Sequence, residues 1–173
     1  MISPDNPLLA AWSETLARNA ERPAIFAEDG RVVRTFSQIE NEAMELQGPF
    51  DPFPERSVIA VQIGNSPRWP ALLLALMRRR LIPLPVGADL APAELDGALA
   101  TCGTSALVTN AKQPIEIAPR PGPRTGPLPD ADFLKLTSGT TALPRAIRFR
   151  ADQLIADADS TVCGSGNRGF NLQ

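Results

Sequence analysis

The spacing of apolar residues along the chain predicts alternating strands and helices in its middle third. Residues 58–63 form a near-continuous apolar run, which is typical of a parallel strand with both faces covered. Beyond residue 65, apolar residues recur at the i, i+3, i+4 and i+7 positions of one helix face. These residues are Trp69, Leu72, Leu73 and Leu76. We therefore expect a strand over 58–63 and a helix that begins at Asn65-Ser66-Pro67 and ends at Arg80.

The same alternation continues toward residue 110. A strand is predicted over residues 81–86, where Pro83 and Pro85 lack amide donors and so indicate irregular pairing or a position at the edge of a sheet. A helix over 92–101 and a strand over 105–109 follow. The β-α-β-α-β order predicts an α/β fold with a parallel core and right-handed crossovers.

The first fifty residues predict a helix, a hairpin and a second helix. Asn6-Pro7 is a typical helix start, with Pro7 at the first helical position. Two strands over 24–27 and 32–36 flank a turn that contains Asp29-Gly30. Ser37 and Glu40 have the spacing of a capping box, which predicts that the next helix begins there and runs to about Leu46.

Residues 113–130 are rich in proline and glycine and predict an extended connector with a minor strand at 115–117. A strand at 132–136, a returning strand at 145–149 and a helix from 151 to about 162 complete the expected elements. Residues 1–162 are therefore expected to form one partial α/β domain. Residues 163–173 are expected to be an irregular glycine-rich tail.

Composition removes several classes of function. The 173 residues are 43% hydrophobic and 21% charged, as in a folded globular protein, and the net charge of −2 offers no basic field for a nucleic acid. Histidine is absent, which excludes Ser-His-Asp and Cys-His nucleophiles and histidine metal ligands. The longest strongly apolar run, 71–77, is too short to span a bilayer, and a basic secretory region is lacking at the start. A cytoplasmic protein without a membrane span is the expectation.

Four isolated residues carry candidate chemical groups. Cys102 and Cys163 cannot form a zinc site alone and are expected to be unreactive free thiols. Asp130 and Asp132 flank the strand at 132–136 and have the chemistry to reach a magnesium ion. Solvated turn carboxylates are the favoured interpretation of both.

The most concentrated chemistry lies in residues 134–146, between an apolar strand and a Pro-Arg step. Small and hydroxyl-bearing residues allow a backbone to approach a ligand closely, and successive amides in a turn can bind an anion. A permanent guanidinium charge follows. The predicted phosphate-binding residues are Thr137, Ser138, Gly139, Thr140, Thr141, Ala142 and Arg145.

Other phosphate motifs fit this chain poorly. A Walker A spacing is absent. The letters of a dinucleotide fingerprint occur at Gly164, Gly166 and Gly169, but they follow a predicted helix rather than a strand. An ordinary turn between two strands is the alternative for residues 137–145, because Ser, Thr and Gly are common turn formers.

The stretch from Leu136 to Arg145 closely resembles the Thr-Ser-Gly-Thr-Thr-Gly-x-Pro-Lys signature of the adenylate-forming (AMP-binding) ligases. That superfamily includes acyl-CoA synthetases, peptide-synthetase adenylation domains and luciferases. The resemblance extends, in order, to about Ser160, and it favours the phosphate loop over the ordinary turn. It includes Thr35–Ile39, Val58–Ile63, Asn65-Ser66 with the following helix, Ile82–Val86 and Ala106–Thr109.

The resemblance implies a two-step reaction in which a carboxylate attacks the α-phosphate of ATP and a thiol then takes the acyl group. The loop would hold the β- and γ-phosphates, with Arg145 as the cation. ATP and magnesium are the implied cofactors, and the thiol of coenzyme A or of a carrier protein is implied for the full-length ligase. No catalytic residue and no metal ligand is assigned within the chain.

Two positions differ from the signature, since Ala142 replaces glycine and Arg145 replaces lysine. If position 142 requires positive φ, alanine there costs about 1 kcal/mol.

The segments that bind adenine and ribose, the hinge and the catalytic lid of the ligases have no counterpart in this sequence. The chain is thus expected to be a truncated N-terminal portion of the ligase fold, inactive alone, with the missing C-terminal portion or a second copy as partner. A non-catalytic remnant or interaction domain is the alternative.

Overall fold

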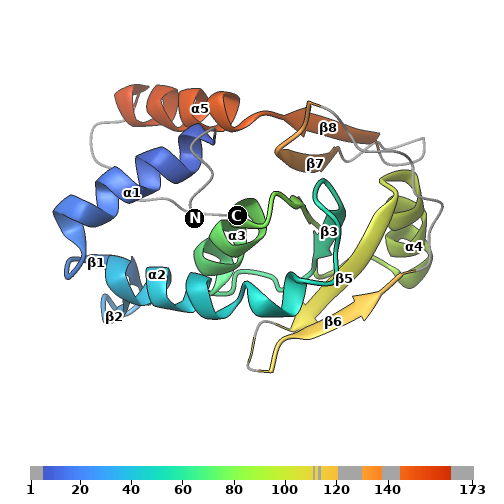
Figure 1. The fold of residues 1–173 in the computed structure, drawn as a ribbon, viewed down its shortest axis with the longest axis horizontal. Coiled ribbons are helices and arrows are strands. Elements are labelled where there is room, and N and C mark those ends of the chain that lie inside the picture. The colour runs from blue at the N-terminus through green and yellow to red at the C-terminus, as the bar shows by residue number, and fades with distance from the viewer. Residues whose placement is uncertain (1–5, 111, 113, 121–129, 138–144, 165–173) are drawn as a thin grey trace.

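A four-stranded sheet lies beside α3, in the right half of the molecule as drawn in Figure 1. The computed structural model describes residues 6–110, 112, 114–120, 130–137 and 145–164, with side chains to residue 157. The strand order is β4-β3-β5-β6; β3 is parallel to β4 and β5, whereas β6 is antiparallel to β5. The strands are β3 (Val58–Val61), β4 (Ile82–Pro85), β5 (Thr104–Asn110) and β6 (Glu116–Pro119).

The crossover helices α3 (Trp69–Arg78) and α4 (Pro92–Thr101) confirm the predicted β-α-β-α-β order. All four residues of β3 are buried, as the apolar run predicts. The proline-containing β4 lies at the edge of the four-stranded sheet, which confirms that prediction. Helix α3 begins at Trp69 with Pro70 in its first turn, so Pro67 precedes the helix rather than entering it as predicted.

The N-terminal region contains α1 (Pro7–Asn19), the hairpin β1 (Pro23–Phe26) and β2 (Val32–Thr35), and α2 (Phe36–Glu45). Asn6 caps α1 as predicted, accepting hydrogen bonds from two backbone amides. A short 3₁₀ turn, Gly48–Phe50, follows α2.

The predicted capping box of α2 is wrong. The box is formed by Thr35 and Gln38, because the Thr35 hydroxyl accepts from the Gln38 amide and the Gln38 side chain accepts from the Thr35 amide. The predicted Glu40 binds elsewhere: its carboxylate accepts hydrogen bonds from Trp12 and Arg78.

The core has one apolar cluster on each face of the sheet, and β3 contributes alternate residues to both. Ile59 and Val61 pack with residues of α1, α2 and α3, whereas Val58 and Ala60 pack toward α4. Leu134, only 1% exposed, joins the second cluster. Buried apolar residues from residue 9 to residue 134 therefore form two clusters, which β3 connects through the sheet.

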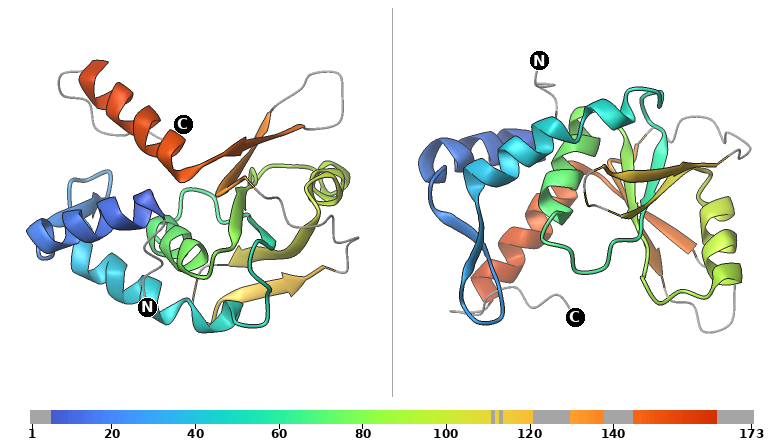
Figure 2. Two further views of the ribbon diagram at one scale, coloured as in Figure 1. Left: turned by 45° about the horizontal axis from the view of Figure 1, so that its top comes forward. Right: turned by 90° about the horizontal axis from the view of Figure 1, so that it is seen from below.

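A second hairpin consists of β7 (Phe133–Thr137) and β8 (Arg145–Phe149) and leads into α5 (Ala151–Gly164). Strand β7 lies against β4, on the side of the sheet away from β6 (Figure 2). Helix α5 lies alongside α1 (Figure 1). The residues of the predicted tail beyond Gly164 lie outside the described residues, and no described helix is long and apolar enough to cross a membrane.

Candidate functional site

The two ends of the predicted phosphate loop are held together by the β7–β8 hairpin. Thr137 and Arg145 are direct partners in the antiparallel register, and the Thr137 hydroxyl donates to the Arg145 carbonyl at 3.2 Å. Thr137 is half-buried and Arg145 is exposed. The remaining predicted ligands lie outside the described residues: Ser138, Gly139, Thr140, Thr141 and Ala142.

The guanidinium of Arg145 is accessible to an anion. Among the described residues, no carboxylate lies within ion-pair distance of it. Arg150, just beyond β8, differs because it donates to both oxygens of Asp152 at 3.1 and 2.7 Å. The hydrogen bond and charge of Arg150 lower the pKa of the exposed Asp152 carboxyl below its ordinary value. Among the described residues, Arg145 thus has no ion-pair partner, whereas Arg150 is paired with Asp152.

The hairpin has one face in the core and one face outward. Leu134, Leu136 and Ala146 pack into the core beneath α4. Because side chains alternate along a strand, Lys135 and Thr137 lie on the opposite face, where Lys135 is paired with Ile147 and Thr137 with Arg145. Lys135 is exposed and adds a second cation to this outward face. The sequence prediction omitted it, although alternation from Thr137 would have placed it there.

The base of the hairpin is fastened by Asp132. One carboxylate oxygen accepts from Arg56 Nη1 at 3.3 Å, and the other accepts from the Ala151 amide at the start of α5 at 3.0 Å. The expectation of a solvated turn carboxylate is therefore wrong for Asp132, whereas Asp130 is exposed. In the part of the chain that the structure describes, no group of three or more acidic, cysteine or histidine side chains is placed to hold a metal ion.

The fold of this chain is similar to that of several solved structures. One is VinN in complex with 3-methylaspartate (TM-score 0.71, 16% identity, 91% of this chain and 52% of that chain covered). A second is O-succinylbenzoate coenzyme A synthetase (MenE) from Bacillus subtilis in complex with AMP (TM-score 0.70, 18% identity, 91% of this chain and 46% of that chain covered). A third is the N-terminal domain of FACL13 from Mycobacterium tuberculosis (TM-score 0.70, 16% identity, 90% of this chain and 47% of that chain covered). The chain thus spans about half the length of these structures, and it shares their fold.

A search of curated proteins found no match. A family model described as "AMP-binding enzyme" matches residues 12–132, which include the sheet and both crossover helices and end just before β7. The loop residues 137–145 lie beyond this match. On the strength of the matched region, the chain belongs to the AMP-binding enzyme family, and its fold corresponds to part of the solved structures above.

Proposed function

We propose that this chain holds the phosphates of ATP during carboxylate adenylation, as the N-terminal part of an AMP-forming acid–thiol ligase. The observation that carries the proposal is the pairing of Thr137 with Arg145 at the ends of the loop. This pairing brings a hydroxyl-bearing side chain and an exposed guanidinium to one end of a hairpin seated on the core. Ser138, Gly139, Thr140, Thr141 and Ala142 are the further proposed phosphate ligands.

The proposed chemistry places negative charge where these groups lie. A carboxylate oxygen bonds to the α-phosphorus of ATP while the bond from that phosphorus to the pyrophosphate oxygen breaks. Charge develops on the departing pyrophosphate, and fixed donors and cations stabilise it. Arg145 supplies a planar, permanently charged fork in place of the lysine of the family signature.

Magnesium and a thiol complete the proposed cofactor set. Magnesium keeps several waters and binds through few protein carboxylates and the substrate phosphates, so it would arrive as the ATP complex. The thiol of coenzyme A or of a carrier protein would then take the acyl group from the adenylate in the full-length ligase.

Titration calorimetry with pyrophosphate and with magnesium-ATP tests phosphate binding directly. We expect saturable heat for both ligands in the millimolar range, because the loop alone supplies only part of a nucleotide site. Pyrophosphate should compete with ATP, since both would occupy the same donors. If neither ligand gives heat, and both fail to shift amide resonances in β7 and β8, the chain does not bind phosphates through this loop.

Exchange of labelled pyrophosphate into ATP, assayed with a panel of carboxylic acids, tests catalysis by the chain itself. We expect no exchange, because adenylation requires acid, nucleotide and metal to be positioned together and the loop is one part of that arrangement. Robust exchange would show that residues 1–173 suffice for the first half-reaction.

The second candidate function is an interaction domain with little nucleotide binding. Two large apolar side chains favour it: Phe26 is 57% exposed and its register partner Val32 is 44% exposed. Light scattering separates the candidates. A concentration-dependent dimer that the double variant Phe26→Ser, Val32→Thr abolishes, without phosphate binding, would favour the interaction domain.

A further inference from the structure

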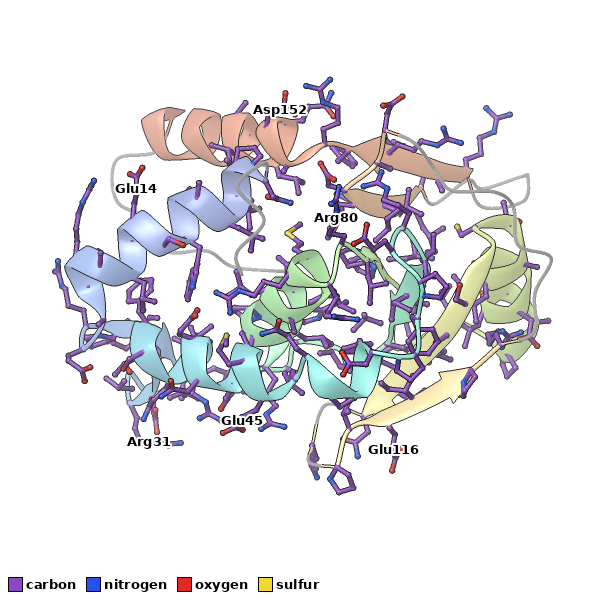
Figure 3. All side chains as sticks on the ribbon, viewed as in Figure 1. Glu14, Arg31, Glu45, Arg80, Glu116 and Asp152 are labelled. Atoms are coloured by element: carbon purple, nitrogen blue, oxygen red, sulfur yellow. The ribbon has the colours of Figure 1, made fainter. Side chains whose placement is uncertain are left out.

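Arg56 joins the central sheet to the segment that enters the β7–β8 hairpin. It lies two residues before β3 with φ of 67°, in the left-handed region that non-glycine residues rarely adopt. Its amide donates to the carbonyl of Arg80 at 2.8 Å, and Arg80, just before β4, is also left-handed with φ of 55°. This bond fixes the Arg56 backbone between the starts of two core strands (Arg80 is labelled in Figure 3).

The Arg56 guanidinium then contacts a segment distant in sequence. Its Nη2 donates to the carbonyl of Ala131 at 2.7 Å, and its Nη1 lies 3.3 Å from Asp132 Oδ1. The two side chains are only 24% and 33% exposed. A carbonyl and a carboxylate are thus engaged at once by different nitrogens of one planar group, a geometry that lysine cannot reproduce.

Asp132, just before β7, in turn contacts the end of β8 and the start of α5. Its amide donates to the Phe149 carbonyl at 2.8 Å, and its second carboxylate oxygen accepts from the Ala151 amide at 3.0 Å. The entrance to β7, the exit from β8 and the first turn of α5 therefore meet at one residue. Through Asp132, Arg56 holds all three against the sheet.

We propose that Arg56 is a positioning residue that sets where Thr137 and Arg145 lie relative to the sheet. The inference rests on the phosphate-binding function proposed above. Strand β7 rises about 3.3 Å per residue, so Thr137 lies roughly 17 Å from Asp132 along the hairpin. Because of this length, a tilt of about 5° at the base displaces the ends of the loop by about 1.5 Å, and misplacements of about 1 Å can reduce a rate about 100-fold.

Pyrophosphate affinity of three variants tests the inference. Arg56→Ala removes both contacts and should weaken binding about tenfold through misplaced donors. Arg56→Lys retains the charge and should lie between Arg56→Ala and the wild type. Asp132→Asn keeps an oxygen for the Ala151 amide but loses the ion pair, and it should also be intermediate. Arg79→Ala is the matched control, because it removes a 3.3 Å pair with Asp51 that does not contact the hairpin.

Amide hydrogen exchange separates positioning from general stability, and it needs no ligand. In Arg56→Ala we expect faster exchange in β7 and β8 while β3 and β5 keep their protection. Faster exchange throughout the chain, with Arg56→Lys no better than Arg56→Ala, would reduce Arg56 to a structural role and overturn the inference. Unchanged exchange and affinity in Arg56→Ala would overturn it as well. If the wild-type chain binds no pyrophosphate, the proposed function fails, and exchange still decides whether Arg56 places the hairpin.

Discussion

A single carboxylate, that of Glu40, joins three helices of the N-terminal region. It accepts two hydrogen bonds from Arg78 Nη2, at 2.9 and 2.8 Å, and one from Trp12 Nε1 at 2.8 Å. Glu40 lies in α2, Arg78 in α3 and Trp12 in α1. The Arg78 side chain is only 7% exposed, so its charge depends on this partner.

Removal of Arg78 should destabilise the fold strongly. In Arg78→Ala the partly buried Glu40 loses its charge partner, and we expect a loss of about 2–4 kcal/mol in the free energy of unfolding. Urea denaturation of the wild type and of the variant measures this loss. Arg18→Ala is the control, because its pair with Glu14 is 75% and 70% exposed and should contribute less than about 0.5 kcal/mol. Equal effects of the two variants would refute this role of Glu40.

The buried thiol of Cys102 should make the free energy of unfolding depend on pH. Burial raises the pKa of Cys102 above its ordinary value. The unfolded thiol ionises first as the pH rises, so the folded state binds more protons there, and stability falls above about pH 8.5. Compared with the wild type, Cys102→Ala should lose less free energy of unfolding between about pH 7 and pH 10. Identical slopes in urea titrations would contradict this assignment.

At the scale of elements, the sequence predicted types and order well and some boundaries poorly. Helix α4 spans the predicted residues 92–101, because proline at its first position marks the start. The start of α2 was missed because two overlapping segments, Thr35–Gln38 and Ser37–Glu40, both have the form of a capping box. Contacts with Trp12 and Arg78, distant in sequence, occupy Glu40, and no local pattern contains that information.

The cap of α2 can be tested by a pair of substitutions. Thr35→Ala removes the hydroxyl that accepts from the Gln38 amide, and we expect it to cost about 1 kcal/mol. Ser37→Ala removes a hydroxyl that contacts only the Thr35 hydroxyl among the described groups, so its effect should be smaller. Urea unfolding of both variants is the measurement. A larger loss in Ser37→Ala would favour the box predicted from sequence.

At the scale of the whole molecule, the sequence predicted the parallel core and the family, both of which the fold and the comparisons confirm. It predicted the ends of the loop, and the hairpin brings Thr137 and Arg145 together. It did not predict that Arg56 contacts Asp132, because that contact joins residues 76 positions apart and follows from an unusual backbone conformation. Phosphate binding by the loop stays a prediction.

The most direct test of that binding compares two arginines of β8 by pyrophosphate titration. Arg145 and Arg148 are both exposed, but they lie three residues apart and so on opposite faces of the strand. If Arg145 holds phosphate, Arg145→Ala should weaken pyrophosphate binding about tenfold. Arg148→Ala removes the same charge from the other face and should leave the affinity within about twofold. Equal losses in the two variants, or none in Arg145→Ala, would contradict a phosphate site at the end of this hairpin.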